Sequence, residues 1–389
     1  MLLESLKDLF NQSAFVNITW QQGILIIVSL VLLYLGIVKK FEPLLLVPIA
    51  FGMLATNLPG SNVFNPELWE NMKNINYGDV LRNGGLLDIL YIGIKVGLFP
   101  PLIFMGIGAM TDFGPLIANP KSFILGASAQ FGIFSAYFLA TKLGFTAAES
   151  GAIGIIGGAD GPTAIYLCAK LARNILPAVA VAAYSYMSLV PLIQPPVIKL
   201  LTTKKDRAIK MEQLRPVTRT ERILFPIVST MACGLILPAS VPLVGMLMFG
   251  NLLRECGCTE RLSLAAQNEV LNATTIFLGI SVGATMSAES FLTVATLKII
   301  ALGLVAFIFS TAGGVLFGQI MKVVSGGKIN PIIGAAGVSA VPMAARVCQK
   351  VVSKEFPGSY ILMHAMGPNV AGVIGTAVAA GAMLTLLTK

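Results

Sequence analysis

Long apolar runs separated by short polar segments dominate the pattern of residues along this chain. The first run covers residues 23–38, and two lysines, Lys39 and Lys40, follow it directly. Further runs lie at about 43–58, 97–118, 122–140, 150–169, 175–200, 223–239, 241–253, 270–287, 294–321, 330–349 and 359–387. Runs of this length without alternation are typical of membrane helices and not of transmembrane β-strands. The pattern predicts an all-α polytopic membrane protein.

The composition agrees with this class. Charged residues make up 12% of the chain and hydrophobic residues 56%, whereas a soluble domain has roughly 25% charged residues. The net charge of +9 has its clearest block at 204–222. A basic segment between apolar runs marks the cytoplasmic face of a membrane. We therefore expect a membrane protein with no nucleic-acid partner.

The basic segment divides the chain into two membrane halves. We expect an N-terminal membrane repeat at 21–200, a basic cytoplasmic loop at 201–222 and a C-terminal membrane repeat at 223–389. The tail 1–20 is expected on the external side, because Glu4, Lys7 and Asp8 give it a net charge of −1, whereas Lys39 and Lys40 follow the first run. For the same reason the first run is interpreted as an anchor and not as a removed signal peptide.

Two stretches of the chain resemble each other and indicate an internal repeat. Residues 157–170 align with 337–350, and residues 103–107 resemble 276–280. The matched pairs in the longer stretch are Gly157/Gly337, Pro162/Pro342, Ala164/Ala344, Cys168/Cys348 and Lys170/Lys350. Paired segments interrupted by glycine and proline point to a transporter site at a repeat interface. We expect two inverted repeats with broken or re-entrant helices, although chance similarity among Gly/Ala-rich helices is the alternative.

Asp160 is the only charged residue between positions 151 and 169. A carboxylate at the centre of a membrane helix costs about 2.5–3.5 kcal/mol. Its neighbours are glycines and Pro162, which lacks an amide hydrogen, so the helix is expected to unwind here. Unwound carbonyls beside a carboxylate suit a small hard cation. The alternative is that Asp160 caps the helix that begins at Pro162.

The matching segment of the second half, residues 330–346, contains no carboxylate. It supplies an amide, a hydroxyl and a cation, on Asn330, Ser339 and Arg346, and Asn369 adds a second amide beside a Gly-Pro pair. Ser339 also suits close helix packing, and Arg346 also suits an interface position where its charge reaches water.

Two tyrosines in the first half, Tyr184 and Tyr186, are not distinguished by the sequence, because aromatic residues also form the interfacial belt of membrane proteins. The single histidine and the five cysteines form no recognisable metal motif, and Cys256-Gly-Cys258 lacks the spacing of a zinc knuckle. A Walker-type phosphate loop is also missing. The sequence thus indicates neither a histidine or cysteine metal site nor ATP binding.

With these features, the chain closely resembles the β subunit of the sodium-pumping, biotin-dependent decarboxylases, which act on oxaloacetate, methylmalonyl-CoA or glutaconyl-CoA. The resemblance covers nearly the whole length and is most specific in the strings GGADGPTAIY, residues 157–166, and GVSAVPMAAR, residues 337–346. The stretch between about residues 60 and 98 is short for the oxaloacetate type, which favours one of the two acyl-CoA types.

The resemblance implies roles for particular residues of this chain. The residues expected to take part in catalysis are Tyr186, Ser339 and Arg346. Those expected to contact biotin are Arg346 and Asn369. Those expected to bind Na⁺ are Asp160, Asn330, Gly334, Ser339 and Asn369. The implied reaction is decarboxylation of carboxybiotin, coupled to Na⁺ export and to uptake of a proton.

The resemblance also implies partners and a location. They are a carboxyltransferase α subunit, a biotin carrier protein and a small single-span membrane subunit, with further copies of this chain in a homo-oligomer. The expected location is the bacterial inner membrane. Two other classes remain open: a sodium-coupled secondary transporter without decarboxylase chemistry, and a non-catalytic membrane scaffold. A secondary transporter has no need of carboxybiotin, whereas the expected decarboxylase requires it. A scaffold does not explain a carboxylate, Asp160, inside the membrane.

Overall fold

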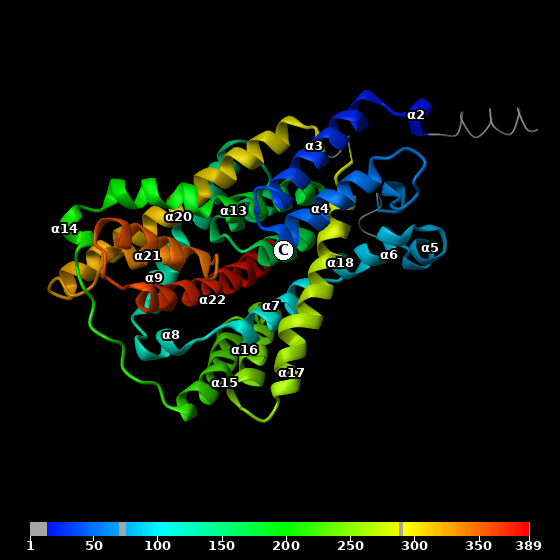
Figure 1. Ribbon diagram of the computed structural model, residues 1–389. Coiled ribbons are helices and arrows are strands. Elements are labelled where there is room, and N and C mark those ends of the chain that lie inside the picture. The colour runs from blue at the N-terminus through cyan, green and yellow to red at the C-terminus, as the bar shows by residue number, and fades with distance from the viewer. Residues whose placement is uncertain (1–13, 70–74, 288–290, 389) are drawn as a thin grey trace, which may run out of the picture.

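The computed structural model describes residues 14–69, 75–287 and 291–388 (Figure 1). In these ranges every regular element is helical and no strand occurs. Five helices are long and apolar enough to cross a membrane, or six if the bent pair α6–α7 counts as one span. The prediction of an all-α polytopic membrane protein is confirmed. The predicted tail, residues 1–20, lies mostly outside the described ranges.

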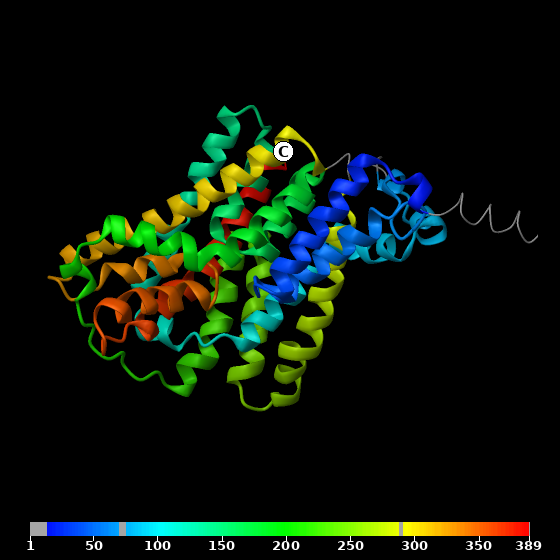
Figure 2. The ribbon, with the colours of Figure 1, turned by 45° about the horizontal axis from the view of Figure 1, so that its top comes forward.

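One group of helices, which we call the flanking bundle, comes from residues 20–110 and 219–284. Its α4 packs against α3 and α18, and its α7 packs against α16 (Figures 1 and 2). Its helices are α3 (Trp20–Ile37), α4 (Pro43–Thr56), α5 (Tyr77–Asn83), α6 (Leu86–Lys95), α7 (Phe99–Met110), α15 (Arg219–Ile236), α16 (Val241–Glu255), α17 (Glu260–Ala265) and α18 (Leu271–Ala284). Shorter elements join them: α2 (Ala14–Asn17), η1 (Pro66–Trp69), α8 (Gly114–Ala118), η4 (Pro238–Ser240) and the π-helical turn η5 (Ala266–Val270).

The other group, which we call the hairpin bundle, comes from residues 122–207 and 294–387. Its helices are α9 (Ser122–Ala129), α10 (Phe131–Lys142), α11 (Ala147–Gly154), η2 (Ile155–Gly158), α12 (Gly161–Leu171), η3 (Arg173–Ile175), α13 (Leu176–Leu201), α14 (Lys204–Arg207), α20 (Val294–Val324), η6 (Pro331–Gly337), α21 (Met343–Glu355) and α22 (Leu362–Leu387). Each half of the chain contributes to both bundles, so the two halves are intertwined.

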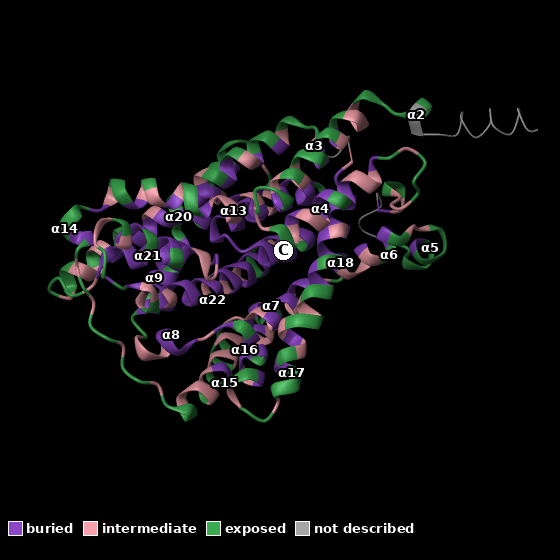
Figure 3. Cartoon of the chain, viewed as in Figure 1, coloured by how far each residue is buried: buried purple, intermediate pink, exposed green. Residues whose placement is uncertain are grey.

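Burial separates the interior of the hairpin bundle from the outer helices. Helices α9 and α22 are largely buried, whereas α3 and α15 expose much of their length (Figure 3). The exposed residues are mostly apolar; Leu200, Leu235 and Ile236, for example, are each more than 80% exposed. Large exposed apolar surface is unusual in a soluble monomer and is what a lipid-facing surface requires.

Two broken elements of the hairpin bundle enter it from opposite ends. The first, α11–η2–α12, starts and finishes at one end, where Asn174 donates a 2.6 Å hydrogen bond to Glu149. The second, η6–α21, starts at Asn330 and finishes at Glu355, and both of these residues contact Arg207 at the other end, beside the basic segment. The chain therefore forms two opposed re-entrant hairpins. Inverted repeats would produce this arrangement, and the repeat itself stays a prediction.

Two glycines permit a close backbone crossing in the hairpin bundle. Gly314 of α20 lies against Gly334 of η6, and a Cβ atom on either glycine would collide with the carbonyl oxygen of the other. No larger residue fits without moving one of these backbones. The crossing holds the second hairpin directly against α20.

A polar cluster fixes the end of the bundle beside the basic segment. Lys322 of α20 donates a 2.6 Å bond to Asp206 of α14, and Gln319 and the backbone amide of Thr203 also donate to this carboxylate. Burial alone would raise the pKa of Asp206, but these donors outweigh burial and hold the pKa well below its ordinary value.

We predict that Asp206→Asn lowers the melting temperature of the detergent-solubilised protein at pH 7. A carboxylate with a depressed pKa stabilises the fold above its unfolded pKa of about 3.9, and this contribution is lost as the pH falls through the folded pKa. The expected loss at pH 7 is about 1.5–3 kcal/mol. The difference from the parent should shrink in acid, and Asp79→Asn, on α5, is the control. A difference that stays constant below pH 4 would contradict this account.

Candidate functional site

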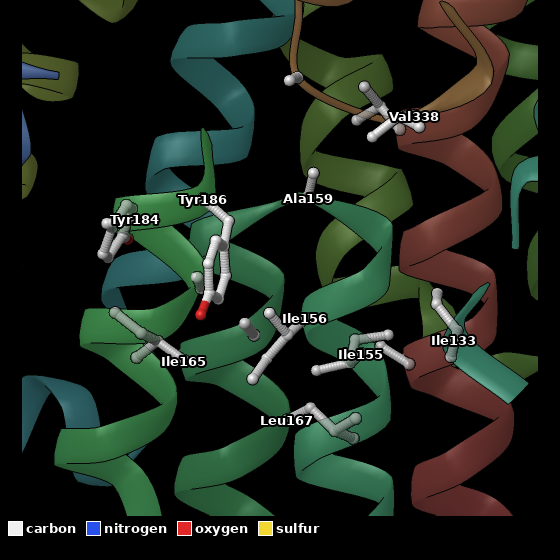
Figure 4. Packing of buried hydrophobic residues seen from close by; sticks show 14 of the residues in the cluster. Ile133, Ile155, Ile156, Ala159, Ile165, Leu167, Tyr184, Tyr186 and Val338 are labelled. Carbon is white, nitrogen blue, oxygen red and sulfur yellow. The ribbon is translucent and has the colours of Figure 1, made fainter. Parts of the chain in front are cut away.

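The tips of the two hairpins touch in the interior of the hairpin bundle. The backbone amide of Ser339, on the second hairpin, donates a 3.0 Å hydrogen bond to the carbonyl oxygen of Gly158 on the first. Figure 4 shows Ala159, at the bend of the first tip, on the side that faces Val338 of the second. Ala159 has φ of 53°, a left-handed conformation that costs energy in a residue other than glycine. The strained bend leads directly into Asp160.

Asp160 caps the N-terminus of α12, and its carboxylate accepts a 3.3 Å hydrogen bond from the amide of Thr163. The residue is only 5% exposed, and no basic side chain in the described ranges pairs with it. The capping role left open by the sequence is therefore present. A helix N-terminus stabilises an anion by about 0.3–1 kcal/mol, or up to about 2 kcal/mol in a partly buried site. This does not offset the cost of an ionised carboxylate in a dry interior, so Asp160 is suited to a cation.

Several buried oxygen atoms in the hairpin bundle lack any hydrogen-bond partner. Among these orphan atoms are Thr163 Oγ1, Tyr184 Oη, Gln194 Oε1 and Asn369 Oδ1. Each such atom costs about 1–3 kcal/mol, and native structures normally satisfy them. The backbone amide of Thr163 donates to the carboxylate of Asp160. The ring of Tyr184 packs over Gly161, the residue that follows Asp160. Oxygen atoms without partners thus lie on residues that adjoin the buried carboxylate.

A short hydrogen-bond chain runs behind the junction of the tips. The hydroxyls of Ser339 and Thr376 are 2.6 Å apart, and Thr376 donates a 3.2 Å bond to Gln130. A Cβ atom on Gly158 would collide with Thr376, so this hydroxyl also lies against the first tip. Residues from both hairpins, from α22 and from the turn between α9 and α10 are joined here.

Two amide side chains donate hydrogen bonds to backbone carbonyl oxygens of the second hairpin, near the end of η6. Asn369 of α22 donates to the carbonyl oxygens of Ala336 and Val338, at 2.9 Å and 2.7 Å. Gln194 of α13 donates to Ala335 at 2.9 Å. Since both NH₂ groups are committed to backbone, both side-chain oxygens stay free. The free Oδ1 of Asn369 suits the predicted role of this residue as a Na⁺ ligand. Asn369 does not hydrogen-bond to Asp160 directly.

Three of the predicted site residues lie elsewhere. Asn330 caps η6 and donates to the carbonyl oxygens of Arg207 and Ile209, so it binds the basic segment. Gly334 directs its carbonyl oxygen at Gly314 of α20. Arg346 is exposed on α21, on the arm that follows the second tip. The structure brings Asp160 and Ser339 together through their tips but leaves these three residues outside that junction.

The two tyrosines that the sequence did not distinguish occupy different places on α13. The Tyr186 hydroxyl donates to the carbonyl oxygen of Ile300 on α20, and its ring packs at Gly303 beside Ile156. Tyr184 packs over Gly161 and has an unpartnered hydroxyl. Figure 4 shows the two rings on different sides of the helix. Tyr184 is thus the tyrosine in contact with the turn that carries Asp160.

Sequence reasoning missed several polar residues of this region. Gln130, Gln194 and Thr376 are fully or nearly fully buried in the hairpin bundle. Gln130 and Gln194 are amides inside long apolar runs, which is the same signal that revealed Asp160. Thr376 carried no such signal, because hydroxyl residues are common in membrane helices.

A cavity opens at the end of the molecule beside the basic segment. Its volume is about 610 Å³, and it lies between α8, the segment 211–217, the start of α15 and the start of α22. Its polar lining residues include Asp112, Arg215, Arg222, Tyr360 and His364. Arg222 pairs with Asp112 at 3.0 Å, while Arg215 pairs with Glu221 at 2.8 Å. The cavity is large enough for a small organic group, and two arginine side chains, Arg215 and Arg222, line it.

Opposed hairpins that meet at an unpaired buried carboxylate define a polytopic membrane protein of the ion-translocating class. Comparison with known proteins gives the family. The chain belongs to the Na⁺-transporting oxaloacetate decarboxylase beta subunits, whose family model matches residues 21–387. It is therefore the beta subunit of a Na⁺-transporting decarboxylase, and such a subunit is part of a multi-subunit complex.

Individual relatives cover the whole chain. The chain is 59% identical to the methylmalonyl-CoA decarboxylase subunit beta of Veillonella parvula, over 99% of this chain and 98% of the relative. It is 57% identical to the glutaconyl-CoA decarboxylase subunit beta of Acidaminococcus fermentans, over 98% of each. It is 48% identical to the oxaloacetate decarboxylase beta chain of Haemophilus ducreyi, over 99% of each. The family resemblance stated from the sequence is confirmed.

Proposed function

We propose that this subunit decarboxylates carboxybiotin carried on a partner protein and uses the reaction to export Na⁺ across the bacterial inner membrane, with consumption of one proton. The observation that carries the proposal is the buried, unpaired Asp160 at the junction of two opposed hairpins. Capping α12 alone does not offset the cost of burying this charge, so a bound cation is the expected partner of the carboxylate. Family membership supplies the link between Na⁺ and decarboxylation.

The proposed Na⁺ site uses the oxygen atoms around the first tip. Asp160 supplies the charge, and Thr163 Oγ1 and the Tyr184 hydroxyl are unpartnered oxygens on adjoining residues. Ser339 and Asn369 supply further oxygens from the second tip and from α22. Hard cations prefer such oxygen ligands. Asn330 contacts the basic segment, and Gly334 contacts α20. We therefore propose that these two residues position the second hairpin, in place of the ligand roles that the resemblance implies.

The proposed proton comes from a hydroxyl group in the hairpin bundle. Loss of CO₂ from carboxybiotin is easier when the ureido nitrogen receives a proton, which is general-acid catalysis. Tyr186 is the proposed donor, with Ser339 in a secondary role. Na⁺ beside these groups disfavours their protonated forms, and the proton is then released toward biotin. The bond from Tyr186 to the Ile300 carbonyl must open for this transfer.

Arg346 is the proposed anchor for the carboxylate of carboxybiotin. It is exposed on α21, close in sequence to the second tip, and the resemblance assigns it to catalysis and biotin binding. A guanidinium group holds a carboxylate through two parallel hydrogen bonds. Such bonds are worth about 1.5–3 kcal/mol each.

We predict that Arg346→Gln raises the KM for free carboxybiotin by about 10–100-fold, because charge-assisted bonds to its carboxylate are lost. Arg346→Lys should recover only part of the affinity, since lysine cannot form the paired bonds. The control is Lys350→Gln, an exposed cation one turn further along α21. An unchanged KM together with a faster passive Na⁺ leak through vesicles would instead assign Arg346 to blocking the return of Na⁺.

The cavity beside the basic segment is the proposed entrance for the biotin group. It adjoins the segment expected in the cytoplasm, where a mobile carrier works, and its volume and polar lining suit a small polar group. The partners we propose are a carboxyltransferase alpha subunit, a biotin carrier protein, a small single-span membrane subunit and further copies of this chain. The acyl substrate itself would bind the alpha subunit.

We propose a complex of the acyl-CoA type. The alignment with the oxaloacetate relative runs over 432 positions, whereas those with the methylmalonyl-CoA and glutaconyl-CoA relatives run over 388 and 383. The longer alignment is consistent with extra residues in the oxaloacetate type that this chain lacks. Assay of the purified complex with each of the three substrates tests this assignment.

The proposed direction of pumping depends on topology, which labelling can test. We predict that Ser13→Cys reacts with an impermeant maleimide in intact cells, while Lys210→Cys reacts only after permeabilisation, because basic segments stay inside. Cys233, Cys256 and Cys258 should be replaced by serine beforehand, since none of the three is buried. Labelling of Lys210→Cys in intact cells would reverse the orientation.

A sodium-coupled secondary transporter remains the alternative function, because opposed hairpins also suit a carrier. A carrier would move Na⁺ with a co-substrate and without carboxybiotin. Na⁺ uptake into vesicles with and without carboxybiotin separates the two functions, and a requirement for carboxybiotin supports the decarboxylase.

A further inference from the structure

The turn between α16 and α17 carries two cysteines whose sulfur atoms are neighbours. Cys256 and Cys258 flank Gly257, which has φ of 72°, and this left-handed turn brings the two side chains to one side. The Cys258 thiol donates to the Cys256 sulfur at 3.6 Å. Cys258 is exposed and Cys256 is half-buried, whereas Cys168 and Cys348 are buried in the hairpin bundle. The turn thus presents a dithiol that reagents in solution can reach.

Polar groups around the turn favour a thiolate on Cys256 in particular. The Thr259 hydroxyl lies 3.0 Å from the Cys256 sulfur. This hydroxyl bond, followed by the bond from the backbone amide of Cys258, lowers the pKa of the Cys256 thiol to about 7, while Cys258, which donates to Cys256, has a raised pKa. The Thr259 hydroxyl is also 2.8 Å from the Leu253 carbonyl oxygen, to which it donates.

Charged groups from all three surrounding helices face this turn. Arg219 of α15 donates a 2.9 Å bond to the carbonyl oxygen of Cys256, and its guanidinium lies against Gly257. Arg254 and Glu255, at the end of α16, pair with each other at 3.5 Å, and Glu260 begins α17. The guanidinium of Arg219 contacts the turn itself, and a cation at this position favours an anionic sulfur.

We propose that Cys256 and Cys258 form a dithiol site that exchanges with low-molecular-weight disulfides, with Cys256 as the nucleophile and Cys258 as the resolving thiol. The Cys256 thiolate attacks one sulfur of the external disulfide, whose S–S bond breaks and releases one thiolate. The Cys258 thiolate then attacks Cys256 in the mixed disulfide and releases the second. The two protein thiols are oxidised to one disulfide, the external disulfide is reduced to two thiols, and the two protons pass to these leaving groups.

Trypsin digestion places both cysteines in one short peptide, so their oxidation state can be measured by mass spectrometry. Trypsin cuts after Arg254 and Arg261, so one peptide, residues 255–261, contains both cysteines and no others. The purified complex is incubated with oxidised glutathione, free thiols are alkylated, and the digest is analysed by mass spectrometry. Cys233, half-buried on α15, serves as the internal reference.

We expect the parent peptide to lose two hydrogens, whereas Cys258→Ser should stop with glutathione attached to Cys256. In Cys256→Ser the remaining thiol should react about tenfold more slowly at pH 7, because its thiolate fraction is smaller. Thr259→Val should shift the pH at which the rate rises toward the ordinary thiol range, near 9. A Cys258→Ser protein without glutathione on Cys256, or an unchanged rate in Cys256→Ser, would overturn the proposal.

Discussion

Asp160→Asn is expected to abolish Na⁺-stimulated decarboxylation while leaving carboxyl transfer to biotin in the partner subunit intact. The substitution keeps the shape of the side chain and its capping bond to Thr163, but it removes the only charge at the hairpin tip. Removing one partner of a buried ion pair costs about 3–5 kcal/mol. Since every 1.4 kcal/mol is tenfold in affinity, Na⁺ affinity should fall by at least about 100-fold.

The measurement is the rate of CO₂ release from the purified complex as a function of Na⁺ concentration. Thr163→Val should give a smaller loss of Na⁺ affinity, because it removes one neutral oxygen and no charge. Asp79→Asn, on α5 of the flanking bundle, is the control and should match the parent. If Asp160→Asn keeps the Na⁺ dependence of the parent, Asp160 is not a Na⁺ ligand.

Tyr186→Phe is expected to lower the decarboxylation rate by about 100-fold or more, which is the usual contribution of a general acid. In the parent, Na⁺ and a proton compete for the same region, so Na⁺ affinity should weaken as the pH falls. This pH dependence should flatten in Tyr186→Phe, because the exchangeable phenolic proton is gone. Ser339→Ala should give a smaller effect.

Tyr184→Phe is the matched comparison, two residues away on the same helix. Its hydroxyl has no partner and its ring packs over Gly161. We expect this variant to lose Na⁺ affinity by about 5–30-fold, from the loss of one neutral oxygen ligand, and to keep the pH dependence of the parent. The reverse pattern in the two variants would assign the proton to Tyr184. If both variants keep the pH profile and the rate of the parent, neither tyrosine is the proton donor, and water or His364 becomes the next candidate.

Much of the first hairpin was predictable because its signal is local. A lone carboxylate in an apolar run, next to glycines and a proline, predicts an unwound turn with a cation site. In the structure Asp160 also caps α12. The tip of the second hairpin hydrogen-bonds to the tip of the first, from Ser339 to Gly158. The alignment of 157–170 with 337–350 pairs these two breaks from the sequence alone.

The rest of the site depended on long-range packing that no local pattern reports. The sequence did not reveal that the bundles interleave both halves of the chain, or that Asn330 binds the carbonyl oxygens of a segment more than a hundred residues away. It also left Tyr184 and Tyr186 equivalent, because which one meets the first tip depends on the rotation of α13 against α20. Residues such as Thr376 acquire a role only through the partners that the fold supplies.

The central claim is that Na⁺ movement through this subunit and decarboxylation of carboxybiotin are one coupled process. The most direct test reconstitutes the purified complex in vesicles, with the basic segment 201–222 facing outward, and supplies free carboxybiotin. Release of labelled CO₂ and uptake of ²²Na⁺ are then followed together. The account predicts that Na⁺ enters the vesicles only while carboxybiotin is consumed, that CO₂ release stops without Na⁺, and that Asp160→Asn stops both. Uptake of Na⁺ without carboxybiotin, or CO₂ release that is indifferent to Na⁺, would contradict it.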